Sequence, residues 1–413
     1  MTLGFDRRRL LTGGAAAAGL ALAAPALLRH ARAEGTGPIR IGFPVPLTGP
    51  FGAEANDQVR AAQIAVKEFN AAGGLGGRLA EILVRDDKLN PGEAATRTLE
   101  LIEKDKVNVL VGGLSAAVTL SINNVARGRG VIYNSISQSD AITEAKDFGR
   151  TTFHEALSPH MTAGAVGRYV FPRHGKRVAF LTADYAYGHE MVRGFRRAGA
   201  AFGIEVVSDV RHPIGATDYS AFLPMIASLR PDVLCLCNFG RDQVVSVQQA
   251  TEFGLKQSTK LVAPVLLLTA RKAGGEAFEG VVGGTSYYWG LEETVPSARA
   301  FNDKFRAAYG GAVPSDYGAL GYAGVRSVLE AAKLAGSVET DRLVPALEAL
   351  RADFYKGPQY FRTCDHQSVQ SVLIVESKFR NQRTPDDLFS IVHAEAPDEA
   401  GLRSCAELGH RQG

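Results

Sequence analysis

A regular alternation of short apolar runs with longer amphipathic runs, beginning at Ile39, constrains the fold of this chain more than any other feature. The run IRIGFPV at 39–45 has the length and composition of a buried strand, and the segment 57–73 places apolar residues at helical spacing before a glycine. The alternation continues to VIYNS at 131–135. Repeated strand and helix units of this kind predict a parallel sheet covered by helices.

A second series of the same kind follows, from KRVAFLTAD at 176–184 to KLVAPVLLL at 260–268. Further helices are expected at 296–311 and 317–337, and a late strand in SVLIVESKF at 371–379. A chain of 413 residues with 46% hydrophobic residues can bury enough surface for two domains. We therefore predict an α/β protein made of two doubly wound, parallel-sheet lobes.

Residues 1–33 differ in composition from the rest of the chain. An arginine cluster that includes Arg7 and Arg8 precedes an apolar stretch, which ends in small residues at Ala31 and Ala33. These parts predict a twin-arginine type of signal peptide, removed near Ala33, and hence export to the periplasm. A membrane anchor is the alternative, but the stretch consists mostly of alanine and glycine and is only weakly apolar.

Charge and motifs exclude several classes of partner and cofactor. The formal net charge is only +3, and part of it belongs to the first 33 residues, so no basic face for nucleic acid is expected. The glycines at 73–77 follow a helix instead of a strand, which predicts a helix end and turn and not a dinucleotide-binding loop. We expect no cofactor, no metal site and a monomer.

The four cysteines fall into two groups. Cys235 and Cys237 lie two residues apart in a strand-like run, where their side chains share a face, so buried thiols are expected there. Cys364 and Cys405 remain free to pair, and a disulfide between them would tie the C-terminal tail to the body of the protein. No cysteine has the spacing of a zinc site.

Ser115 lies in GGLSAAVTLS, between a predicted strand and a predicted helix. The helix start would present the backbone amides of Ser115, Ala116 and Ala117 to a carboxylate or carbonyl oxygen. A second role, compatible with the first, is that of a helix N-cap whose hydroxyl bonds back to the helix. Catalysis by Ser115 would need a neighbouring base, and the chain contains none of the common serine hydrolase motifs.

Several segments resemble a known family when they are taken together and in order. They resemble the periplasmic substrate-binding proteins of the leucine/isoleucine/valine-binding family, which serve ABC importers, and the likeness covers nearly all of residues 38–395. The segments are IGFPVPLTGPFG, AAQIAVKEFNAAGGLGGRLAEILVRDDKLNPGEA, GGLSAAVTLSI, DYAYG, GATDYSAFLPMI and DHQ.

The resemblance implies two lobes of the type I periplasmic binding protein fold, joined by three crossovers, with a small ligand closed between them. The implied division is 38–158 with 287–352 for one lobe and 159–286 with 353–395 for the other, followed by a tail at 396–413.

The implied ligand contacts come from both lobes. One lobe contributes the loop of Ser115 and Ala116 and the turn SISQS; the other contributes two aromatic walls. The remaining implied contacts are Ser137, Gln138 and Ser139 in the turn, and Tyr187 and Phe239 as the walls. Four further aromatic residues near the crossovers are candidates, although each alone is more typical of a core: Tyr185, Tyr288, Trp289 and Tyr317.

Three departures from the family bear on the ligand. Ala116 stands where relatives that hold amino acids tend to have a hydroxyl, and Glu54 stands where many place a ligand-stacking tyrosine. The segment that usually supplies an acid for an α-ammonium group reads APVLLLTA and has no acid. A buried ammonium without a carboxylate partner is costly, so an apolar ligand with one oxygen-rich end is expected unless Glu54 takes over the ammonium.

These observations predict a non-enzymatic, exported receptor that captures a small polar molecule and presents it to an ABC permease. The first alternative is an exported α/β hydrolase for an amide or ester, for which His154 and His160 are the nearest candidate bases to Ser115. The second alternative is the sensor lobe of a membrane receptor.

Overall fold

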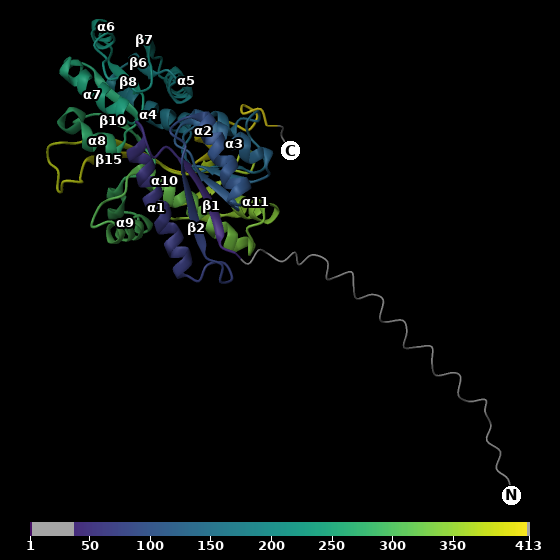
Figure 1. Cartoon of the computed structure of the whole chain (residues 1–413). Coiled ribbons are helices and arrows are strands. Elements are labelled where there is room, and N and C mark those ends of the chain that lie inside the picture. The colour runs from purple at the N-terminus through teal and green to yellow at the C-terminus, as the bar shows by residue number, and fades with distance from the viewer. Residues whose placement is uncertain (2–36, 411–413) are drawn as a thin grey trace. The chain divides into compact units, whose positions relative to one another are not determined.

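The first series of strands forms a five-stranded sheet in the computed structural model (Figure 1), with the order β2-β1-β3-β4-β5. Every neighbouring pair is parallel, as predicted. The strands are β1 (Ile39–Val45), β2 (Ala80–Asp86), β3 (Val109–Gly112), β4 (Ile132–Ser135) and β5 (Thr152–His154). We call this sheet, with the helices packed on it, lobe 1.

The α-helices of lobe 1 are α1 (Gly52–Ala71), α2 (Pro91–Leu99), α3 (Ala116–Gly128), α9 (Pro296–Ala308), α10 (Asp316–Ala335) and α11 (Thr340–Ala349), and α9 packs against α1 and α10. Helices α1 and α10 pack closely against each other along the middle of the molecule in Figure 1. The glycines after α1 form a turn in which Gly73, Gly74, Gly76 and Gly77 all have positive φ, which confirms the predicted helix end.

The second series forms a seven-stranded sheet of order β15-β14-β10-β9-β8-β6-β7, which we call lobe 2 with its helices. Its strands are β6 (Arg177–Ala183), β7 (Glu205–His212), β8 (Val233–Cys237), β9 (Lys260–Val265), β10 (Val282–Thr285), β14 (Val372–Ser377) and β15 (Phe389–Glu395). Helix α4 (Pro159–His174) precedes β6 in the sequence. The helices between later strands of this sheet are α5 (Ala186–Ala200), α6 (Leu223–Ser228), α7 (Arg241–Glu252) and α8 (Leu268–Gly274).

The sheet of lobe 2 is not wholly parallel, because β14 runs antiparallel to both β10 and β15. The chain leaves lobe 2 after β10 and builds α10 and α11 in lobe 1 before it returns. It therefore re-enters lobe 2 at the end of the sheet where β10 finishes, and β14 must run in the opposite direction.

The chain passes between the two sheets three times, after β5, after β10 and before β14. Near the last passage a small antiparallel sheet is formed by β11 (Arg351–Ala352), β12 (Gln359–Phe361) and β13 (Ser368–Val369). A bridge between His154 and Gln367 joins the first passage to the last. The residue boundaries implied for the lobes, including the break at 353, stay a prediction.

The tail after β15 is held by a disulfide between Cys364 and Cys405, the pair left free by the sequence analysis. Cys235 and Cys237 are buried free thiols, as expected. The tail also contacts both lobes: Ala145 of lobe 1 donates its amide to the Leu408 carbonyl oxygen (2.9 Å), and Glu407 pairs with Arg197 of α5.

The structure describes Met1 and residues 37–410, and the part from Pro38 onward is one unit. The predicted signal peptide at 1–33 thus lies, apart from Met1, outside the described residues. Within these described ranges no helix has the length and apolar character needed to cross a membrane.

Candidate functional site

Both sheets have a point where the strand order reverses, and three residues of the predicted site follow strands at these points. In lobe 1 the reversal falls between β1 and β3, and in lobe 2 between β6 and β8. Crevices for ligands form at the carboxyl ends of such strands. Ser115 follows β3, Tyr187 follows β6 and Phe239 follows β8, so the fold places all three at these ends.

The loop from β3 to α3 explains why two glycines precede Ser115. A Cβ at Gly112 would lie 2.5 Å from the Pro44 carbonyl oxygen, and one at Gly113 would lie 2.6 Å from the Tyr133 hydroxyl. Both glycines also have positive φ. Only glycine therefore lets this loop pack tightly against β1 and β4.

Ser115 is the N-cap residue of α3, and Ala116 is the first residue of the helix. The Ser115 side chain makes no capping hydrogen bond, so the expected bond from its hydroxyl back to the helix is wrong. The first amides of α3 have no helical partners, as at the start of every α-helix, and α3 begins just beyond the carboxyl end of β3.

The turn after β4 is buried and rich in polar atoms without partners. The hydroxyl oxygens of Ser137 and Ser139 have no hydrogen-bond partner, and both side chains are fully buried. The Gln138 side chain is nearly buried and lies 3.4 Å from the Thr162 hydroxyl of α4. Unpaired hydroxyls in a buried turn destabilise the protein unless a ligand or a water molecule forms hydrogen bonds with them.

An aromatic cluster joins the two lobes beside these loops. Phe239 of lobe 2 contacts Phe51, just before α1, and Tyr317 of α10, with ring centroids 4.8 and 5.1 Å apart. Tyr187 lies 6.0 Å from Phe239 and stacks with Tyr185 at 5.8 Å, and its hydroxyl has no partner. The two predicted wall residues of lobe 2 are thus brought together.

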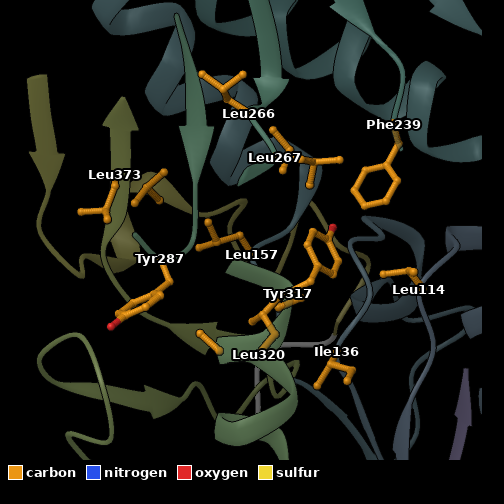
Figure 2. Close-up of a cluster of buried hydrophobic side chains, with 14 of the residues drawn as sticks. Leu114, Ile136, Leu157, Phe239, Leu266, Leu267, Tyr287, Tyr317, Leu320 and Leu373 are labelled. Carbon is orange, nitrogen blue, oxygen red and sulfur yellow. The ribbon is translucent and has the colours of Figure 1, made fainter. Parts of the chain in front are cut away.

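Apolar side chains surround this cluster on the lobe 2 side. Figure 2 shows the Tyr317 ring among leucine side chains, with its hydroxyl directed toward Leu267 and Phe239. Leu266 and Leu267, from the segment without an acid, are fully buried there. The expectation that this segment presents apolar surface is met.

Glu54, in the first turn of α1, lies at the boundary between the lobes. Only 3% of the residue is exposed, and the Thr269 hydroxyl of α8 donates a hydrogen bond to Oε1, while Oε2 has no partner. Burial is the main reason that its pKa is raised to about 7. A groove of about 480 Å³ opens beside Glu54 and is lined by residues of α7 and α8, including Arg241 and Val245.

Asp316, the first residue of α10, is a second buried acid that the sequence analysis missed. It is 2% exposed, and neither of its carboxylate oxygens has a partner. The Thr285 hydroxyl is near enough to lower its pKa, but donates to the Tyr287 carbonyl oxygen (2.9 Å). Burial and, next, the charge of Glu54 raise the pKa of Asp316 to about 7, and the backbone amides of Asp316 and Tyr317 at the start of α10 oppose this rise.

A third buried acid, Glu190 of α5, faces lobe 1. Burial and then the charge of Asp140 raise its pKa to about 8, and hydrogen bonds from the backbone of Asp140 and Ala141 oppose this rise. Asp140 is also buried, which raises its own pKa. Glu190 and Asp140 thus form a contact between the lobes on the side of the SISQS turn.

Within residues 37–410, neither His154 nor His160 is hydrogen-bonded to the Ser115 hydroxyl. Both ring nitrogens of His154 are engaged, with the Ser137 carbonyl oxygen (2.8 Å) and with Gln367 Oε1 (2.7 Å), and burial lowers its pKa. Burial also lowers the pKa of His160, to about 4. Among residues 37–410, no cluster of three histidine, cysteine or acidic side chains could hold a metal ion.

Two aromatic candidates lie elsewhere. The Trp289 indole donates to the Asp386 carbonyl oxygen (2.9 Å), and the Tyr288 hydroxyl accepts the Leu388 amide (3.1 Å). Both side chains fasten the segment before β15, so the structure gives them a supporting role.

Asp316 carried little signal in the sequence. It follows Ser315, which caps α10, and an acid in the first turn of a helix is an ordinary feature. Only the side-by-side packing of α10 and α1 places it near Glu54.

Comparison with known proteins gives one consistent result. Residues 38–383 match the family described as periplasmic binding protein. Leu/Ile/Val-binding protein homolog 7 of Brucella abortus is 25% identical over 344 residues, which are 79% of this chain and 84% of the relative.

Solved structures agree with the fold. A periplasmic binding protein from Burkholderia mallei has a TM-score of 0.83 at 28% identity and covers 90% of this chain and 98% of its own. A solute-binding protein from R. palustris, solved in complex with benzoate, has a TM-score of 0.79 at 24% identity. The match covers 89% of this chain and 100% of that protein.

Proposed function

We propose that this chain, which belongs to the periplasmic binding protein family, captures one small organic molecule between its two lobes and delivers it to an ABC permease. Members of this family bind solutes and do not transform them. Ligand capture needs hydrogen-bond donors and a shaped wall but no proton transfer, which suits a site whose nearest histidine is fully engaged. The ligand closes the two lobes because it makes contacts in the closed state that it does not make in the open state.

The observation that carries this proposal is the set of buried polar atoms without partners at the carboxyl ends of both sheets. Ser137 and Ser139 contribute hydroxyls from lobe 1, and Tyr187 contributes one from lobe 2. Native proteins leave few such atoms unpaired, so their presence at the strand ends of both lobes supports a bound group there.

We propose that the oxygen-rich end of the ligand meets the amides of Ser115 to Ala117 and the SISQS turn. Its apolar body then lies against Tyr187 and Phe239, with Leu266 and Leu267 nearby. A carboxylate suits the positive end of α3, and an apolar body suits the aromatic wall.

A thermal-shift screen of aliphatic acids, aromatic acids, amides and amino acids tests the function. A ligand at about 100 times its dissociation constant should stabilise the folded protein by roughly 2.7 kcal/mol. Recovery of the ligand unchanged supports a receptor, whereas its hydrolysis would establish the enzyme alternative. Benzoate belongs in the screen because a neighbour of the same fold has been solved with it.

The location and the partners complete the proposal. We propose that the twin-arginine segment at 1–33 exports the chain, that the mature protein works in the periplasm as a monomer, and that an inner-membrane permease receives the ligand. A permease gene beside the coding sequence would favour transport over the sensor alternative.

A further inference from the structure

The ligand end proposed above occupies the loops of Ser115 and Ser137 and leaves two buried acids, Glu54 and Asp316, without a role. Neither acid forms an ion pair within the part of the chain that the structure describes, and three of their four carboxylate oxygens have no partner. An unpaired acid in a protein interior costs several kcal/mol, so two in one place call for a binding partner.

The two acids lie close together because α1 and α10 pack side by side, and the contacts along the two helices show that they run in the same direction. A Cβ at Gly321 would lie 2.3 Å from the Gln58 carbonyl oxygen, and further along both helices Lys333 lies over the Phe69 ring. The first turns of the two helices are therefore neighbours.

Two other buried polar groups lie at the same place. Gln58, one turn after Glu54 on the same face of α1, is fully buried, and neither of its side-chain amide atoms has a partner. From lobe 2, the unpartnered hydroxyl of Tyr187 lies within electrostatic range of Asp316. These groups come from three helices, so the cluster is a built site and not only two acids at helix ends.

We propose that Glu54 and Asp316 together bind a protonated amine of the ligand. This inference rests on the proposed function and assigns the second end of the same ligand. An ammonium group has three donors, and the acids offer three free oxygens, of which one can carry the remaining proton while the others accept from the ammonium. The ligand class is then a small molecule with a carboxylate or amide at one end, an apolar body and a primary amine.

The charges of such a complex balance. Burial raises the pKa of each acid to about 7, so one carboxyl can keep its proton while the other is ionised beside the ammonium. The bond from Thr269 holds Glu54 in place from lobe 2, which means that this amine would also favour closure.

Calorimetric titration of the mature protein with matched ligand pairs tests the inference. The pairs are leucine with 4-methylpentanoate, phenylalanine with 3-phenylpropanoate, and 4-(aminomethyl)benzoate with 4-methylbenzoate. In at least one pair the amine should bind about 30-fold or more tightly, because its absence leaves buried charge unpaired. The variants E54Q and D316N should each remove most of this preference.

Asp57→Asn is the control, because it removes a charge from α1 that pairs with Arg60 near the surface. It should keep the preference. If E54Q or D316N does not fold, the comparison within pairs on the unaltered protein still decides.

Acids that bind as tightly as their amines would overturn the amine site and leave the proposed function standing. The amine site would also be overturned if 4-hydroxybenzoate bound more tightly than every amine. The two acids would then accept a hydrogen bond from a neutral hydroxyl group of the ligand. No binding by any compound would reject both proposals.

Discussion

The Glu54 carboxyl group loses nearly all contact with water on folding and gains one side-chain hydrogen bond, from Thr269. That exchange favours the neutral acid, which is why its pKa rises to about 7. The charges that face it are Asp57 on its own helix, Asp316 on α10, and Arg241 across the groove. Without a ligand, ionised Glu54 is therefore a source of instability.

The Glu54→Gln variant should change how stability depends on pH. A carboxyl whose folded pKa is raised stabilises most below its usual pKa and loses that contribution as pH rises through 7. The ligand-free protein should lose up to about 3 kcal/mol from this group between about pH 4.5 and 8. E54Q should lack this loss.

Urea unfolding at pH 5 and pH 8 measures the difference. D57N is the control, and its slope should change far less, because Asp57 acts on Glu54 only as the smallest of the causes of its pKa. Equal slopes for E54Q and the unaltered protein would show that Glu54 is already ionised at low pH, and would contradict its burial.

At the scale of residues, sequence reasoning found the loops of the site but only one of its acids. Glu54 stood out because relatives place a tyrosine there, whereas Asp316 looked like an ordinary helix start. The roles of the other predicted site residues stay a prediction. Which buried groups lack partners depends on side chains far apart in the sequence, and no local pattern reports it.

At the scale of elements, periodicity predicted the two parallel series well because buried strands and amphipathic helices differ in period. It did not predict the direction of β14, which depends on where the chain re-enters lobe 2. β5, β12 and β13 have only two or three residues each, too few to show a period.

The disulfide is the element that fixes the tail, since Cys364 follows β12 and Cys405 lies beyond β15. The cysteines are 41 residues apart, and closing a loop of this length stabilises by roughly 4 kcal/mol in the chain-entropy model. The double variant C364S/C405S should lose up to that amount in free energy of unfolding, measured by denaturant titration.

Reductant should lower the stability of the unaltered protein toward that of the double variant and leave the variant unchanged. Equal stability of the oxidised unaltered protein and the double variant would show that the packing of Leu402 and Leu408 holds the tail by itself.

At the scale of the whole molecule, three passages of the chain connect the lobes, and side chains on both sides of the site join them. Gly240 shows how close the lobes come, since a Cβ there would lie 2.8 Å from the Pro50 carbonyl oxygen and from the Phe51 ring. Glu54 with Thr269 and Glu190 with the Asp140 backbone are two of the polar contacts between the lobes. Contacts of this kind exist only while the lobes are together, so they set the balance between open and closed states.

Glu190 should make that balance depend on pH. Its pKa of about 8 keeps it mostly neutral at pH 6.5, where it can accept the Asp140 and Ala141 amides without repelling Asp140. The other charges that face this pair are Arg193 of α5, and Arg403 of the tail with Glu144. Above pH 8 the ionised Glu190 lies beside Asp140 in a buried place, which favours separation of the lobes.

Small-angle X-ray scattering of the protein with the tightest ligand from the screen measures this effect. The radius of gyration should increase between pH 6.5 and pH 9, and Glu190→Gln, which keeps the shape and cannot ionise, should remove the increase. E54Q distinguishes the role of Glu54 from that of Glu190. Its effect on closure should depend on ligand binding, whereas the effect of E190Q should depend on pH. If E190Q and the unaltered protein expand alike at pH 9, the charge of Glu190 does not hold the lobes apart. The ion pairs of the tail, Arg403 with Glu144 and Glu407 with Arg197, then become the groups to change next.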